Sequence, residues 1–123
     1  MQLSREEFTE LVQQALDDVP DEFLEKLENV YITVEDYPSR EDLQNTQAAP
    51  GRLLGIYHGV PLGQRSPFSS GLAMPDRITI FQRNLEKFAH SREEIVLQVR
   101  RTVLHEIAHH FGISDQRLRE LGY

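Results

Sequence analysis

Apolar residues recur at three- and four-residue spacing near the start of the chain, which predicts two amphipathic helices. The first is expected to begin at Ser4, because Ser4 and Glu7 have the spacing of a capping box. Its apolar face is formed by Phe8, Leu11, Val12, Ala15 and Leu16. The second is expected over residues 20–28, where Pro20 suits a first helical turn. Together they predict an N-terminal helical segment.

Alternation of apolar and polar residues predicts three strands farther along. In residues 30–35, VYITVE, two valines and an isoleucine alternate with polar or amphipathic residues, as in a strand with one buried face. Residues 52–58 and 77–81 predict the second and third strands. We expect the third strand to lie at an edge of the sheet, where an extended peptide can pair with it. The polar segment 36–51 predicts a loop with a short helical turn.

Residues 59–76 predict a long connection before the third strand. A connection of this length without regular structure is usually functional or disordered. It contains four large apolar residues, and the sequence leaves open whether they line a substrate groove or pack within the loop: Leu62, Phe68, Leu72 and Met74.

The longest predicted helix covers residues 92–111. Ser91 and Glu94 form a second capping-box pattern before it, and Gly112 is well placed as its left-handed stop. Its predicted core-facing arc consists of Val96, Leu97, Val99, Val103, Leu104, Ile107, Ala108 and Phe111. His105 and His109 lie on the opposite side, about 40° apart, beside Gln98 and Thr102. Short helices are predicted before and after it, over residues 83–89 and 114–121.

Composition narrows the classes of protein to consider. The chain has 123 residues, which predicts one domain over residues 1–123. Twenty acidic and 13 basic residues give a net charge of −7, which argues against nucleic acid or an anionic membrane as the main partner. The N-terminal segment lacks a continuous apolar run, and no stretch is long and apolar enough to span a membrane. We therefore expect a cytoplasmic protein.

The absence of cysteine limits the chemistry further. The fold has no disulfide, and no thiolate is present as a nucleophile or a metal ligand. Any bound metal must therefore be held by histidine, aspartate or glutamate side chains.

The segment HEIAHHFGISD, residues 105–115, combines such side chains at informative spacing. His105 and His109 are one helical turn apart, so their rings can converge on one metal ion such as zinc. Gly112 allows the chain to reverse, and Asp115 can then supply a third ligand. A metal with three protein ligands keeps a position for water and lowers its pKa. Glu106 is placed beside that position as a general base.

This string resembles the metal site of the zincin metallopeptidases, in the extended form that has aspartate as third ligand. The wider chain is similar to a family of small bacterial zincin-like metallopeptidases, through LLGIYHGVPLGQRS, MPDRITIF and the helix that leads into the motif. The resemblance implies an α+β fold in which the long helix packs on a small three-stranded twisted sheet. It implies Zn²⁺ held by His105, His109 and Asp115, with Glu106 as catalytic base, and a peptide or protein as substrate. Unlike metzincins, the chain has no methionine after the third ligand; Met74 precedes the motif.

Two other functional interpretations remain open from the sequence. The chain can be a non-catalytic metal-binding or partner-binding protein that keeps a zincin site, or an interaction domain without metal. Glu106 favours the enzyme, because metal binding alone does not require that residue. Oligomeric state, substrate and cleavage specificity are not encoded in any recognisable pattern.

Several further polar residues have two interpretations each. Tyr57, His58 and Tyr123 are candidates to hydrogen-bond an oxyanion, against ordinary packing, and His110 is expected at the surface or behind the ligands. The spacing of four carboxylates fits no calcium loop, so we expect these to be solvated: Glu35, Asp36, Glu41 and Asp42.

Overall fold

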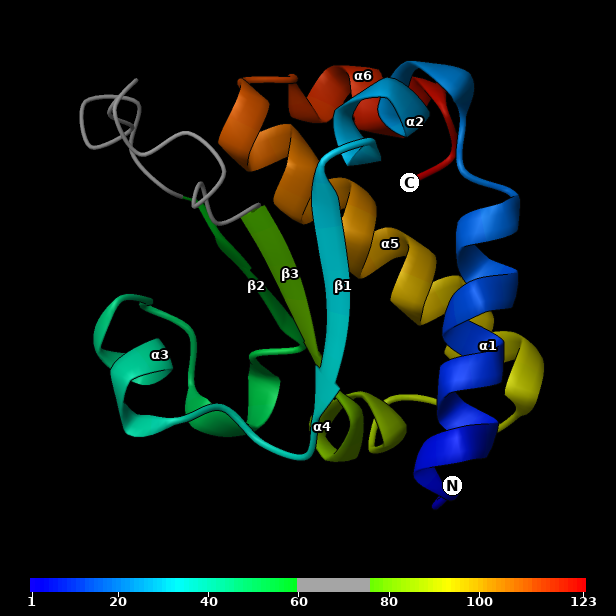
Figure 1. Cartoon of the computed structure of the whole chain (residues 1–123), viewed down its shortest axis with the longest axis vertical. Coiled ribbons are helices and arrows are strands. Elements are labelled where there is room, and N and C mark those ends of the chain that lie inside the picture. Colours follow the sequence, from blue (N-terminus) through cyan, green and yellow to red (C-terminus); the bar gives the residue numbers. More distant parts are fainter. Residues whose placement is uncertain (60–75) are drawn as a thin grey trace.

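Three strands form one mixed sheet in the order β1-β3-β2 in the computed structural model of the chain (Figure 1). The structure describes residues 1–59 and 76–123, so the four apolar residues of the long connection lie outside the described residues. The strands are β1 (Val30–Glu35), β2 (Gly55–His58) and β3 (Asp76–Phe81). β1 runs parallel to β3, with Ile32 opposite Ile78, and β2 runs antiparallel to it, with Tyr57 opposite Ile78.

The position predicted for the third strand is wrong. β3 is the central strand and hydrogen-bonds to a neighbour on each side, so it offers no edge to a peptide. All its residues except Arg77 are buried, which a central strand explains better than an edge strand. The alternation of residues in a strand records which face is buried and carries no information about which strands pair. The exposed edges of this described sheet belong to β1 and β2.

The predicted helices are all present, with small shifts at their ends. They are α1 (Arg5–Asp17), α2 (Asp21–Leu27), α3 (Arg40–Gln44), α4 (Gln82–Glu86), α5 (Arg92–Phe111) and α6 (Asp115–Glu120). The 3-10 helix η1 (Pro50–Arg52) occupies the position where the second strand was expected to begin, so β2 starts three residues later at Gly55. The α+β architecture predicted from the sequence is confirmed. Among the described residues, none of the helices is long and apolar enough to cross a membrane.

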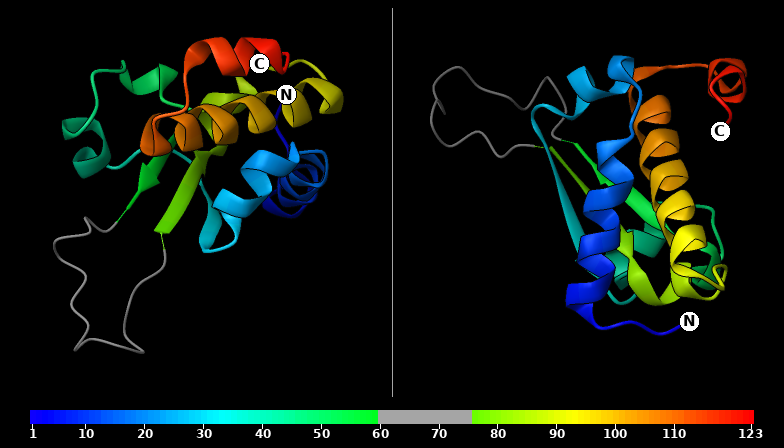
Figure 2. Two further views of the ribbon diagram at one scale, coloured as in Figure 1. Left: turned by 90° about the horizontal axis from the view of Figure 1, so that it is seen from above. Right: turned by 90° about the vertical axis from the view of Figure 1, so that its right-hand side faces the viewer.

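The helix α5 packs against α1, β2 and β3, and this packing forms the core (Figure 2). Ile78 and Ile80 of β3 are fully buried together with Val99 and Val103 of α5. The predicted core face of α5 is wrong at two positions: Leu97 is 37% exposed and Phe111 is 41% exposed, whereas Ile95, which the prediction left out, is fully buried. The two exposed apolar residues lie near the ends of α5, Leu97 in its second turn and Phe111 at its last position.

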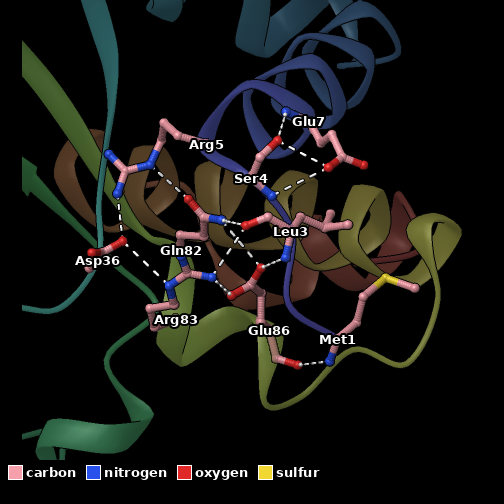
Figure 3. Close-up of polar contacts among 9 residues, drawn as sticks. All are labelled: Met1, Leu3, Ser4, Arg5, Glu7, Asp36, Gln82, Arg83 and Glu86. Carbon is pink, nitrogen blue, oxygen red and sulfur yellow. Dashed lines mark hydrogen bonds and ion pairs between the residues drawn. The ribbon is translucent and has the colours of Figure 1, made fainter.

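A polar network ties the N-terminal residues to α4 (Figure 3). The buried carboxylate of Glu86 accepts hydrogen bonds from the Leu3 backbone at 2.7 Å and from Arg83 at 2.9 Å. The buried Gln82 accepts a hydrogen bond from Arg5 at 2.7 Å and donates one to the Leu3 carbonyl at 2.9 Å. The Ser4–Glu7 capping box predicted for α1 is present. These contacts join the start of α1 to α4, the helix that directly follows β3.

Candidate metal centre

The end of α5 and the start of α6 bring the three predicted ligands together. Gly112 ends α5 with φ 72°, a left-handed conformation that favours glycine, and the N–H of Ile113 donates to the Ala108 carbonyl at 2.8 Å. The chain then reverses, and the Ser114 hydroxyl caps α6 by accepting a hydrogen bond from the Arg117 N–H. Asp115 is the first residue of α6, which places it beside the last turns of α5.

The donor atoms of His105, His109 and Asp115 all lie within 4.8 Å of one another. Around a tetrahedral zinc ion, with bonds of 2.0–2.2 Å, donor atoms are about 3.3–3.6 Å apart. His109 and Asp115 are exposed and His105 is half-buried, so small side-chain rotations can close that difference. Two imidazoles and one carboxylate are a donor set that zinc accepts, and three protein ligands leave a fourth position for water. The residues present therefore fit a zinc ion.

Glu106 lies next to this cluster and is anchored to the sheet. Its Oε2 accepts a hydrogen bond from the backbone N–H of Tyr57, on β2, at 3.1 Å. Burial raises the pKa of the Glu106 carboxyl above its ordinary value, while the hydrogen bond from Tyr57 and the proximity of His109 act in the opposite direction. A carboxylate has two oxygens, so Oε1 can still accept a proton or a hydrogen bond.

A second polar cluster supports the strand beside the metal centre. The hydroxyl of Tyr57 donates to Oδ2 of the buried Asp76, on β3, at 2.6 Å. The ring of His110 stacks on that of Tyr57, with 3.9 Å between centroids, and its Nε2 lies 3.9 Å from Asp76. His110 is thus exposed, stacks on Tyr57 and is not one of the three clustered residues.

The other oxyanion candidates are not brought to the cluster. Because Tyr57 faces α5, alternation along β2 turns His58 to the opposite face of the sheet, where its Nε2 lies 3.5 Å from Asp42. Tyr123 packs against the hydrophobic core. The expectation of solvated carboxylates is wrong for Asp42, which is 7% exposed because it completes a capping box with Ser39 and faces His58.

The contact between β2 and Glu106 could not be predicted from the sequence. Nothing in the pattern of residues 52–58 indicates that the Tyr57 backbone contacts Glu106, since any residue supplies an N–H.

Comparisons with known proteins agree with this geometry. The family model described as zincin-like metallopeptidase matches residues 27–123. A solved structure of a conserved hypothetical protein from T. thermophilus is similar, with a TM-score of 0.55 and 26% identity, over 89% of this chain and 94% of that one. No curated protein matches the chain significantly. The family match covers most of the chain, including α5 and the complete HEIAHHFGISD segment, and the chain therefore belongs to the zincin-like metallopeptidase family.

Proposed function

We propose that this protein is a zinc-dependent peptidase whose metal is held by His105, His109 and Asp115. The observation that supports the proposal most strongly is that the donor atoms of these three residues lie within 4.8 Å of one another. A fourth residue, Glu106, lies beside them with a carboxylate that is not part of the cluster. Metal binding for stability alone does not require that fourth residue. Peptide-bond hydrolysis does, because a proton must be taken from the attacking water and returned to the leaving amine.

Each residue has a distinct part in this proposal. A zinc ion, when bound, lowers the pKa of a water molecule and polarises the scissile carbonyl. Glu106 accepts the proton of that water and later donates it to the leaving amine. The Tyr57 N–H holds one oxygen of Glu106 at 3.1 Å and so fixes the direction of the other. Gly112 and Ser114 set the turn that returns Asp115 to the centre.

The experiment that tests the proposal uses metal removal and return. A peptide library prepared by digestion of a proteome is incubated with the protein as purified, after dialysis against a chelator, and after addition of one equivalent of zinc. We expect new peptide termini in the first and third samples and none in the second. Cleavage that persists after complete zinc removal would contradict the proposal. A protein that binds zinc tightly and cleaves no peptide would instead support a non-catalytic, metal-binding role.

A further inference from the structure

A groove of about 330 Å³ adjoins the metal centre on the side toward the start of α5. One wall consists of residues 52–55, from the end of η1 to the first residue of β2, and the other is the α5 face that carries Gln98, Arg101, Thr102 and His105. His105 and Glu106 form the end of the groove nearest the metal centre. The volume falls within the range of about 300–1,000 Å³ that is usual for sites that bind small ligands or side chains.

Two arginines line this groove, and neither guanidinium has a partner within the described parts of the chain. Arg52 comes from η1, on one wall, and Arg101 comes from α5, on the other. Among the described lining residues, Glu106, whose Oε2 accepts the hydrogen bond from Tyr57, is the one carboxylate. The groove thus carries two cationic side chains within a protein of net charge −7.

Five arginines outside the groove are ion-paired. Arg5, Arg83, Arg92, Arg100 and Arg117 each form an ion pair with at least one carboxylate. Arg100, the neighbour of Arg101 in sequence, points to α1, where it donates to the Ala15 carbonyl at 3.0 Å and lies 3.4 Å from Asp18. Arg40, Arg77 and Arg119 also have no ion pair among the described residues, so the feature that distinguishes Arg52 and Arg101 is that both line the same groove. Guanidinium groups bind carboxylates through charge-assisted, often bidentate hydrogen bonds.

The close approach of α5 to β2 sets the base of the groove. A Cβ on Gly55 would lie 2.6 Å from Cγ2 of Thr102, so the two walls meet there without room for another atom. Arg52 and Arg101 lie on the two walls on either side of this base.

We propose that the groove is a specificity site, in which Arg52 and Arg101 bind a carboxylate of the peptide close to the scissile bond. This inference rests on the proposed peptidase function and names the class of substrate: acidic peptides. The carboxylate has two sources, an aspartate or glutamate side chain or the C-terminus of the peptide. Both present the same chemistry to the guanidiniums, so the experiment must separate them.

The test measures binding without turnover, in the zinc-loaded Glu106→Gln variant. The probes are acetylated, amidated alanine-rich pentapeptides with a single glutamate placed at each position in turn, and matched peptides with glutamine or lysine. A glutamine peptide with a free C-terminal carboxylate forms the second arm. Dissociation constants are measured by calorimetry at low and at high salt.

For one glutamate position we expect binding roughly tenfold tighter than for glutamine, with a ratio that falls as salt rises. Arg52→Gln and Arg101→Gln should each reduce the ratio, and Arg101→Glu should shift the preference toward the lysine peptide. Arg40→Gln is the matched control, because Arg40 is an exposed arginine of α3 that does not line the groove. If the free C-terminal carboxylate tightens binding and an internal glutamate does not, the groove binds the C-terminus of the peptide.

Equal binding of glutamate, glutamine and free-terminus peptides would overturn the inference, as would a glutamate preference that both arginine variants retain. Binding of no peptide at all would also overturn it. The proposed function is judged separately by wild-type cleavage. If cleavage does not depend on the two arginines, the peptidase function is supported and the specificity site is refuted. If the peptides bind in a way that depends on the arginines but the wild type cleaves none, the carboxylate site is supported and the peptidase function is refuted.

Discussion

The backbone N–H of Tyr57 donates a hydrogen bond to the carboxylate of Glu106 over 3.1 Å, joining strand β2 to helix α5 at the metal centre. Two packing contacts nearby fix the positions of Tyr57 and Glu106. Gly55, two residues earlier on β2, lets the strand approach α5, and the stack of His110 on Tyr57 holds the next turn of the helix against the same strand. The position of the proposed general base thus depends on how closely β2 lies to α5.

The first prediction concerns that close approach. Gly55→Ala should lower the free energy of unfolding by about 1–3 kcal/mol, the usual cost of overpacking, because the new Cβ would lie 2.6 Å from Cγ2 of Thr102. Chemical denaturation of the two proteins measures the difference.

Thr102→Ser provides the rescue, since it removes Cγ2 and keeps the hydroxyl that donates to the Gln98 carbonyl at 2.8 Å. Introduced into the Gly55→Ala protein, it should restore part of the lost stability. Failure of the second substitution to restore any stability would show that the clash with Thr102 is not the cause.

The second prediction concerns the turn between α5 and α6. Gly112→Ala should destabilise the protein by about 1 kcal/mol, because the φ of 72° is strained for a residue with a Cβ, although no atom of the described residues lies within 4 Å of that Cβ. Zinc affinity should fall as well, because the turn positions Asp115.

Gly51→Ala is the matched control for this change. Its Cβ would also meet no atom of the described residues within 4 Å, and its φ lies outside the left-handed region, so stability should be unchanged or raised by up to about 1 kcal/mol. Equal effects of the two substitutions, measured by thermal unfolding, would rule out backbone strain at Gly112 as the reason.

The parts of this fold that local patterns determine could be predicted from the sequence. Ser4, Ser91 and Ser114 each cap the helix that follows, and Gly112 ends α5, because these features depend on neighbours within a few residues. The grouping of His105 and His109 with Asp115 follows from helix geometry and one turn, so it could be predicted for the same reason.

The parts that depend on distant residues could not be predicted. Placement of β3 in the centre of the sheet requires knowledge of which strands pair, and the residues of β3 do not encode it. The exposure of Leu97 reflects where α1 and the sheet leave α5 uncovered. The hydrogen bond from Tyr57 to Glu106 joins residues 49 apart through a backbone group that every non-proline residue has.

The third prediction is a pH dependence of the metal-free protein. Burial raises the pKa of Glu106 above its ordinary value of 4.5, so the folded state holds this proton more tightly than the unfolded state does. The contribution of Glu106 to stability is fully present below 4.5 and is lost as pH rises through the folded-state pKa. In the absence of metal, the stability of the wild type relative to Glu106→Gln should therefore decrease as pH rises from 4.5. If the stability of the wild type relative to Glu106→Gln stays constant or increases as pH rises from 4.5, burial does not raise the pKa of Glu106.

The fourth prediction concerns the metal itself. The wild type should bind one zinc ion per chain, and His109→Ala should abolish stoichiometric binding, because two remaining ligands hold the ion poorly. Elemental analysis of protein purified without added zinc measures this. His90→Ala is the control, since His90 is exposed and precedes α5, and it should retain full occupancy. Full occupancy in the His109 variant would refute the assignment of the ligands.

The central claim is that Glu106 acts as a general base beside a bound zinc ion, and the comparison of Glu106→Gln with the wild type tests it most directly. Glutamine has nearly the same shape and can still accept the hydrogen bond from Tyr57, so fold and zinc occupancy should persist. On a peptide that the wild type cleaves, the rate should fall roughly a hundredfold or more. An equal rate in the variant would contradict the proposed mechanism, and loss of zinc from the variant would show that Glu106 is itself a ligand.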